Sequence, residues 1–145
     1  DKTAMHWALL RNYLGVPEIL GSDFQRIARG QVTALGGRLV EARVDAVART
    51  SDGFTVTLEG GERATARFLI LSEGKSPRLA QQLGLVFDEA NGLAVDVNGR
   101  TAVEGVYAVG RLVRPQRSQA IISAGDGAAA AVDILSRVKG QSVQD

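Results

Sequence analysis

Apolar residues follow two different spacings along the chain, and the changes between them predict a mixed α/β fold. The segment Ser22-Asp23-Phe24-Gln25 fits a capping box, in which the Ser and Gln side chains satisfy the first N–H groups of a helix. Apolar residues then recur at helical spacing until the pair Gly36-Gly37. We therefore expect a helix that Ser22 caps and that ends at this glycine pair.

Strand patterns follow this helix. Residues 40–49 alternate between apolar and mostly charged side chains, with Val47 as an apolar exception on the polar face, and a turn at 51–53 leads into a second strand at 54–58. A third strand begins polar after residue 62 and ends in the apolar run Phe68-Leu69-Ile70-Leu71, which is typical of a central parallel strand. The apolar face of the first strand is expected to carry Val40, Ala42, Val44, Ala46 and Ala48.

The segment 105–131 contains a buried strand that leads into a helix. The run Val106-Tyr107-Ala108-Val109 has no polar residue in alternation, which predicts a strand buried on both faces, and Gly110 ends it. A basic loop follows, and a long helix opens at Ala120. This is the layout with which open α/β sheets hold an anion or a cofactor.

Two glycines, Gly125 and Gly127, interrupt this helix at a cost of about 1 kcal/mol each relative to alanine. One interpretation is a close approach of the helix to a ligand. The other is tight packing of the helix on the sheet, with no further role.

The loop Ser72-Glu73-Gly74 closes the run 68–71 on the carboxyl edge of the sheet, where such folds bind ligands.

Composition narrows the classes of function. The chain of 145 residues is 45% hydrophobic, which is enough for the core of a single domain. It contains no cysteine, so a disulfide, a thiolate metal site and a dithiol redox pair are excluded. The net charge of +1 gives no electrostatic case for nucleic acid or an anionic membrane, and no apolar run could span a bilayer. We expect a cytoplasmic protein without a metal site, and a fragment, because the sequence begins at Asp1 without a methionine.

Six segments, in the order of the chain, resemble the FAD domain of thioredoxin reductases and related pyridine nucleotide-disulfide oxidoreductases. They are NYLGVPE, LGGRLVEARV, DGFTVTLEGGE, FLILSEGKSP, GRTAVEGVYAVGR and SQAIISAGDGAAAA. The chain is similar in particular to the small single-domain members, which lack the NADPH domain and the redox cysteines. The resemblance implies an α/β, FAD/NAD(P)-binding, Rossmann-like fold: a parallel sheet with helices and a three-stranded antiparallel β-meander. It also implies that residues 1–145 form one FAD-binding-type domain without its first β-α-β segment.

The resemblance implies roles around FAD for individual residues. Asn12 matches the asparagine beside the flavin, and Val44 matches the residue whose backbone meets the adenine. Ser72-Glu73-Gly74 stands where the family has Ala-Thr-Gly, in the loop near the dinucleotide. Gly110 matches the first residue of the Gly-Asp pair at the ribityl chain. Gln119-Ala120 matches the pair at a helix start that faces the pyrimidine edge of the flavin, where a helix N-terminus stabilises the negative charge of the reduced form.

Three departures from the family pattern change the expected chemistry. Arg111 replaces the aspartate that follows Gly110, which removes an acceptor for the ribityl chain and places a cation near the pyrophosphate. The amino-terminal glycine-rich loop is absent from the sequence, and without cysteine no dithiol relay is possible. Arg111, Arg114 and Arg117 recur every three residues, and they either bind a phosphate or are solvated loop residues.

Two functions remain open at this point. The first is an FAD-dependent oxidoreductase of the thioredoxin reductase-like type, which takes electrons from a diffusible donor, NAD(P)H being one candidate, and passes them to an unknown acceptor. The alternative is a non-catalytic flavin-binding or apo module that regulates or scaffolds a partner. FAD domains of this type often pair, so a homodimer is one oligomeric state to test. No Ser/His/Asp set or paired-carboxylate site supports a hydrolase.

Overall fold

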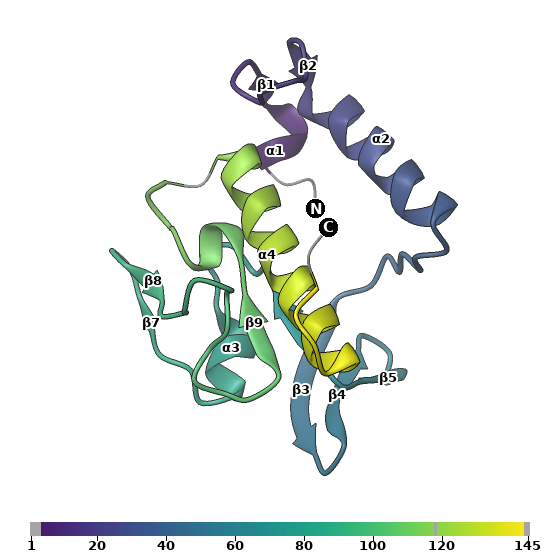
Figure 1. Ribbon diagram of the computed structural model, residues 1–145, viewed down its shortest axis with the longest axis vertical. Helices are drawn as coiled ribbons and strands as arrows, with labels where there is room; N and C mark the ends of the chain where they lie inside the picture. The colour runs from purple at the N-terminus through teal and green to yellow at the C-terminus, as the bar shows by residue number, and fades with distance from the viewer. Residues whose placement is uncertain (1–3, 118, 144–145) are drawn as a thin grey trace. The chain divides into compact units, whose positions relative to one another are not determined.

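The computed structural model describes residues 4–117 and 119–143. The chain forms two compact units, Asp1–Ala42 and Arg43–Asp145. Figure 1 labels the helices and strands of both units. The sequence-based prediction of one domain over residues 1–145 remains a prediction.

The first unit is a short hairpin followed by a helix. Its elements are α1 (Ala4–Trp7), β1 (Leu9–Leu10), β2 (Ile19–Leu20) and α2 (Gly21–Ala34). The strands β1 and β2 pair in antiparallel fashion, and residues 11–18 form the loop between them. Gly21 lies against α1, where a Cβ would come within 1.7 Å of the Met5 carbonyl oxygen. Only glycine therefore fits at the start of α2.

The predicted N-cap of α2 is wrong by two residues. Leu20 is the N-cap, and no side chain caps the helix, so Ser22 lies inside the first turn instead of before it. Gly21, the first residue of the helix, packs against the backbone of α1. The predicted end is confirmed, because the helix stops at Leu35 and Gly36 adopts a positive φ of 82°.

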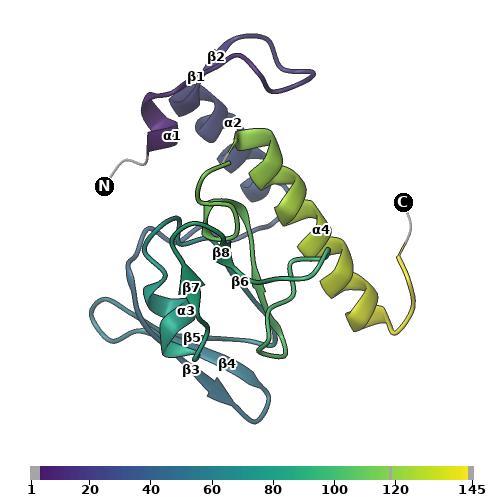
Figure 2. The same cartoon turned by 90° about the vertical axis from the view of Figure 1, so that its left-hand side faces the viewer.

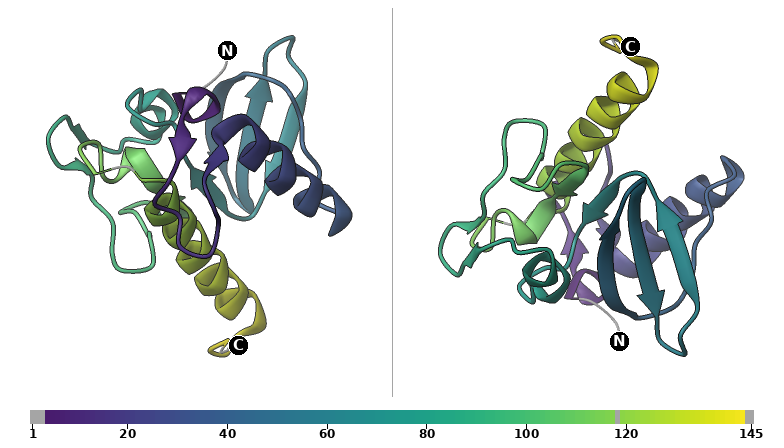
Figure 3. Two further views of the ribbon diagram at one scale, coloured as in Figure 1. Left: turned by 90° about the horizontal axis from the view of Figure 1, so that it is seen from above. Right: turned by 90° about the horizontal axis from the view of Figure 1, so that it is seen from below.

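The second unit contains an antiparallel meander and a parallel strand pair, which can be followed in Figure 2. The meander comprises β3 (Val44–Thr50), β4 (Gly53–Leu58) and β5 (Arg63–Ala66), and the parallel pair comprises β6 (Leu69–Leu71) and β9 (Val106–Ala108). The remaining elements of the unit are α3 (Arg78–Gln82), β7 (Phe87–Asp88), β8 (Gly92–Leu93), the short 3-10 helix η1 (Gly110–Leu112) and α4 (Ala120–Lys139). The view from below in Figure 3 shows the meander strands side by side. The predicted meander and α/β class are confirmed.

Two details of the predicted meander are wrong. The third predicted strand is two strands, since β5 pairs with β4 whereas β6 pairs with β9, and Arg67-Phe68 links them. The first strand begins at Val44, and residues 40–43 are outside it. Its buried residue is Val47, at 7% exposure, whereas Ala46 and Ala48 are exposed. A register shift between Val44 and Ala46 interrupts the simple alternation from which the opposite face was predicted.

The strand β9 is buried on both faces, as its uninterrupted apolar run predicts. Val106 and Ala108 belong to the main core of the unit, together with Phe54, Leu71, Ala80, Leu85, Leu93 and Leu112. Tyr107 and Val109 point to the opposite face and pack with Ala130 of α4. The helix α4 therefore covers one face of the strand pair, and the meander and α3 contribute to the core on the other.

Candidate functional site

The candidate site is the edge at which both parallel strands end. The register pairs Leu71 with Ala108, and the Val109 N–H donates to the Leu71 carbonyl at 3.0 Å, so the loops after β6 and β9 leave the sheet side by side. Each loop contains a glycine with positive φ, Gly74 at 69° and Gly110 at 65°. The structure thus brings the two predicted cofactor loops to one edge of the sheet.

Gly110 lies directly against the first turns of α4. A Cβ at this position would be 3.1 Å from the Ser123 hydroxyl oxygen. The Gly110 N–H donates to Asp126 Oδ2 at 3.1 Å, and the same oxygen accepts from Arg114 Nη1 at 2.5 Å. Asp126 therefore fixes the loop after β9 to the helix. Sequence reasoning missed Asp126, although an acid between Gly125 and Gly127 was a usable signal.

The N-terminus of α4 has a composition that suits a negative ligand. Gln119 is the N-cap residue in an extended conformation, its side chain makes no capping hydrogen bond, and the first turn contains no acidic residue. Ala120 is partly buried and begins the helix. A 20-residue helix presents the positive end of its dipole at this terminus. Gln119 and Ala120 thus lie on the helix whose early turns contact Gly110.

The three arginines of the basic loop have different surroundings. Arg114 forms an ion pair with Asp126, whose side chain is only 16% exposed, so Arg114 has a structural role. Arg111 lies exposed in η1, and it forms no hydrogen bond or ion pair with another residue that the structure describes. Arg117 is also exposed. Arg111 and Arg117 are therefore the cations of this loop, as far as the structure describes it, that no acidic residue neutralises, and Arg111 is the one next to Gly110.

The loop after β6 is tied to a short helix. The Glu73 carboxylate accepts the backbone N–H of Leu79 at 2.7 Å and that of Ala80 at 2.9 Å, so it satisfies the N-terminus of α3. Ser72 is exposed, and a Cβ on Gly74 would meet no atom within 4 Å, so the backbone of this loop is accessible. Glu73 thus has a structural partner, and a contact between this loop and a cofactor remains a prediction.

Val44 and Asn12 are the two remaining residues with a predicted cofactor contact. The Val44 carbonyl accepts a hydrogen bond from the Arg78 guanidinium, and Arg78 Nη1 donates to the Asp45 carbonyl at 2.5 Å. Because α3 contains Arg78, this helix connects the start of β3 to the loop that Glu73 anchors. Asn12 belongs to the first unit, in the exposed loop between β1 and β2.

A hollow of about 700 Å³ opens beside the two loops. Its lining consists of Lys75, Pro77, Gln81, Phe87, Glu89, Ala90 and Gln116. Lys75 follows the loop after β6, and Gln116 follows η1, so residues next to both predicted loops contribute to it. Sequence reasoning did not select Lys75 or Gln116 as site residues, because the resemblance gives Lys75 no role within the segment FLILSEGKSP and Gln116 lies outside all six segments.

A polar network fixes α4 to β9 farther along the helix. The buried Tyr107 hydroxyl donates to Asp133 Oδ2 at 2.6 Å, and Arg100 donates to both Asp133 oxygens at 2.8 and 2.5 Å. Burial first, and then the hydrogen bond to Asp133, raises the pKa of Tyr107 to about 12. The hydrogen bond from Arg100 lowers the pKa of Asp133 below its ordinary value. Asp133 therefore stays ionised and holds the helix in place.

The described residues contain neither a group of three or more acidic or histidine side chains placed to hold a metal nor a helix long and apolar enough to cross a membrane. The chemistry of the edge comes from backbone groups, a helix N-terminus and arginine.

Comparison with known proteins gives the family. Residues 12–127 match the family described as pyridine nucleotide-disulphide oxidoreductase, so the chain belongs to that family. No curated protein sequence matches the chain.

Solved structures of thioredoxin reductases share the fold. The chain is similar to a thioredoxin reductase from Gloeobacter violaceus, with a TM-score of 0.82, 16% identity, and coverage of 98% of this chain and 86% of the other. An atypical thioredoxin reductase from Desulfovibrio vulgaris Hildenborough gives a TM-score of 0.85 at 15% identity, over 97% and 88% of the two chains. The thioredoxin reductase of T. acidophilum gives a TM-score of 0.73 at 14% identity, with coverage of 92% of this chain and 86% of the other. The resemblance inferred from the sequence is confirmed, and the fold is the Rossmann-like fold of thioredoxin reductases.

Proposed function

We propose that this chain binds FAD at the edge where β6 and β9 end, and serves an oxidoreductase of the thioredoxin reductase type that works without dithiol chemistry. One observation carries the proposal: the positive-φ glycine that ends β9 lies against the early turns of α4, a helix with no capping side chain and no acid in its first turn. The absence of cysteine from this sequence supports a reaction without a dithiol relay.

The residues at this edge fit a dinucleotide. The loop backbone around Gly74 is open, since a Cβ there would meet no atom within 4 Å. Arg111 is an exposed cation without an acidic partner among the described residues, so it suits a phosphate. Ala120 is the first residue of α4, so its backbone N–H lies at the positive end of the helix dipole, whereas the N–H of the N-cap residue Gln119 donates to the Arg117 carbonyl at 3.1 Å.

FAD, when bound, supplies the hydride and electron transfer chemistry. The chain contributes position and charge. The helix α4 offers its N-terminus to the part of the ligand that becomes negative on reduction, and Asp126 holds the loop of Gly110 in register with that helix. Electrons would come from a diffusible donor, with NAD(P)H the first candidate.

One observation favours the alternative of a non-catalytic module. Arg111 stands where the family resemblance leads us to expect an aspartate for the ribityl chain, so a contact that the family uses is replaced by a cation. A folded chain that binds FAD without turnover, or that does not bind it, would match this alternative.

The variant Ala120→Glu tests the proposed place of binding. A carboxylate in the first turn of α4 stabilises the helix, yet it repels a negative ligand at the same terminus. We expect FAD affinity about tenfold lower, which corresponds to about 1.4 kcal/mol, with unchanged or higher thermal stability. Flavin fluorescence quenching measures the affinity.

The matched control is Ala131→Glu, which makes the same substitution at an exposed position in the middle of α4. It should leave FAD affinity unchanged. Equal affinities for both variants and the parent chain would place the flavin elsewhere.

A further inference from the structure

A second pocket lies at the opposite end of the parallel strands from the proposed cofactor edge. Phe68 immediately precedes β6 and Gly105 immediately precedes β9, and both line it, so the pocket is at the amino ends of these strands. It has a volume of about 260 Å³. The other lining residues are Arg49, Thr50, Ser51, Asp52, Gly53, Phe54, Arg67, Glu104 and Arg137. All of them belong to the second unit.

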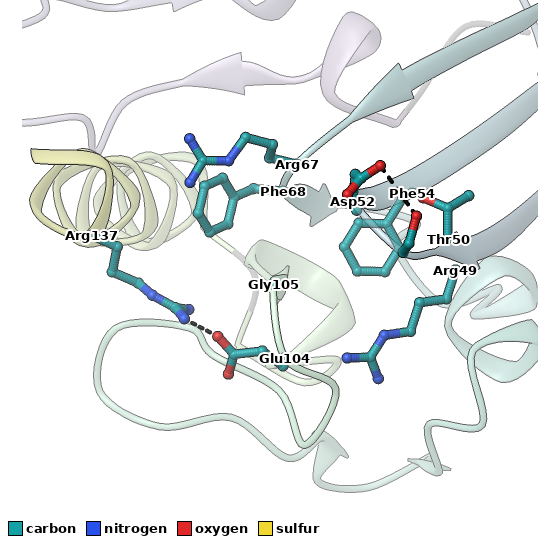
Figure 4. A pocket seen from close by; sticks show the side chains of 11 residues that line it. Arg49, Thr50, Asp52, Phe54, Arg67, Phe68, Glu104, Gly105 and Arg137 are labelled. Atoms are coloured by element: carbon teal, nitrogen blue, oxygen red, sulfur yellow. Dashed lines mark hydrogen bonds and ion pairs between the residues drawn. The ribbon is translucent and has the colours of Figure 1, made fainter. Parts of the chain in front are cut away.

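Three arginines from three different elements line this pocket. Arg49 comes from β3, Arg67 from the link between β5 and β6, and Arg137 from the last turn of α4. Figure 4 shows Arg49 and Arg137 directed into the pocket from opposite sides. The guanidinium carbons of Arg67 and Arg137 lie 5.5 and 5.6 Å from the centre of the Phe68 ring, which orders both side chains.

The positive charge of the pocket is only partly neutralised. Glu104 forms an ion pair with Arg137, and Asp52 accepts a hydrogen bond from the Ser51 hydroxyl at 3.1 Å. Arg49 and Arg67 form no ion pair with another residue that the structure describes. Two guanidinium groups are thus left for a ligand, and the planar donor array of arginine suits phosphate and carboxylate oxygens.

We propose that this pocket binds a small phosphorylated or carboxylated molecule, with Arg49, which points into it, contacting the anionic group and Arg67 adding positive charge from its place over the Phe68 ring. The volume exceeds that of a single anion, and the Phe54 and Phe68 rings in its lining offer apolar surface to the rest of such a molecule. The Glu104 carboxylate, whose side chain is 68% exposed, forms an ion pair with Arg137. It binds one of the three arginines in the way that the anionic group of a ligand would. The site is separate from the cofactor edge, because the parallel strands lie between them.

Titration of the full chain with inorganic phosphate, and separately with acetate, tests this proposal. The amide signals of Gly53 and Gly105, followed by NMR, report on the pocket. We expect saturable shifts with both probes, and tighter binding of phosphate because its charge is larger. Titrations with and without added FAD separate this pocket from the cofactor edge. Absence of saturable shifts at these two amides with both probes would overturn the proposal.

Three variants are expected to weaken, strengthen and leave unchanged the binding of phosphate. The double variant Arg49→Gln/Arg67→Gln should weaken phosphate binding at least tenfold. Glu104→Gln should strengthen it severalfold, because it releases Arg137 to the ligand. Arg63→Gln, at an exposed residue of β5 outside the pocket, is the control and should not change it. An unchanged affinity in the double variant, or an equal loss in the Arg63→Gln control, would contradict a site in this pocket.

Discussion

The phenol of Tyr107 is a polar group in the centre of a buried strand, with its residue 0% exposed. Its hydroxyl donates to Asp133 and accepts a hydrogen bond from Arg137 Nη1 at 3.4 Å, so burial leaves it satisfied. A tyrosine in an apolar run requires such a partner. The sequence predicted the burial of this strand correctly, but it could not show that a residue 26 positions later would accept the hydrogen bond of the phenol.

The raised pKa of Tyr107 predicts a loss of stability at alkaline pH. A group whose pKa is higher in the folded state stabilises the fold below its unfolded pKa, and this contribution disappears as pH rises through the folded value. The relevant window is between pH 10.0 and about 12. We expect the free energy of unfolding to fall across this window, as measured by urea denaturation.

Tyr107→Phe separates this effect from the titration of other groups. The variant should be less stable at neutral pH by about 2 kcal/mol, because it loses a hydrogen bond to a charged carboxylate. It should also lose the part of the alkaline slope that Tyr107 causes. An identical slope in both proteins would mean that the hydroxyl keeps its ordinary pKa.

Single residues that connect elements were the hardest to predict. Asp126 and Glu73 both accept backbone N–H groups, at Gly110 and at the start of α3. The partner of each carboxylate could not be predicted from the sequence, since it depends on which loop the fold brings beside the carboxylate, although the place of Asp126 between two glycines was a usable signal. The glycines were easier, because the positive φ of Gly74 and Gly110 is a local property that a glycine after a buried strand already suggests.

The helix α4 is placed as the sequence predicted, but its two glycines do not have the predicted surroundings. A Cβ at Gly125 or Gly127 would meet no atom of the described residues within 4 Å, so neither glycine lies close to the sheet. The interpretation as tight helix–sheet packing is therefore wrong. The residue that packs α4 on the strand pair is Ala130, which is 0% exposed. Close approach of a ligand remains a prediction for both glycines.

Gly125→Ala distinguishes an open helix surface from a covered one. With open space around the new methyl group, the variant should gain about 0.5 to 1 kcal/mol, since alanine is the better helix former. Gly30→Ala in α2, where a Cβ also meets nothing within 4 Å, is the matched control and should gain a similar amount. Thermal unfolding measures the change in stability of both variants. Destabilisation by Gly125→Ala alone would show that another group lies against this turn.

Strand boundaries depended on pairing partners that the sequence does not display. The run from residue 63 to 71 was predicted as a single strand, yet β5 and β6 belong to different sheets. Likewise, Val47 was assigned to the polar face of β3, and it is the buried residue of that strand. The register shift between Val44 and Ala46 changes which side chains of β3 face the core. Counting the alternation of apolar and polar residues in the sequence cannot detect such a shift.

At the scale of the whole molecule, the order of motifs carried more information than any element alone. Each motif is weak, but their order predicted a family that the match of residues 12–127 confirms. The predicted cofactor contacts are distributed over both compact units, with Asn12 in the first and the other residues in the second. Their joint role in binding follows from the family resemblance, and a test needs the cofactor itself.

The most direct test of the account is the visible absorption spectrum of the purified chain after incubation with FAD and gel filtration. The account predicts flavin bands corresponding to about one FAD per chain, and fewer for the Ala120→Glu variant. A colourless chain with the circular dichroism and cooperative unfolding of a folded protein would contradict FAD binding and support the role of an interaction module.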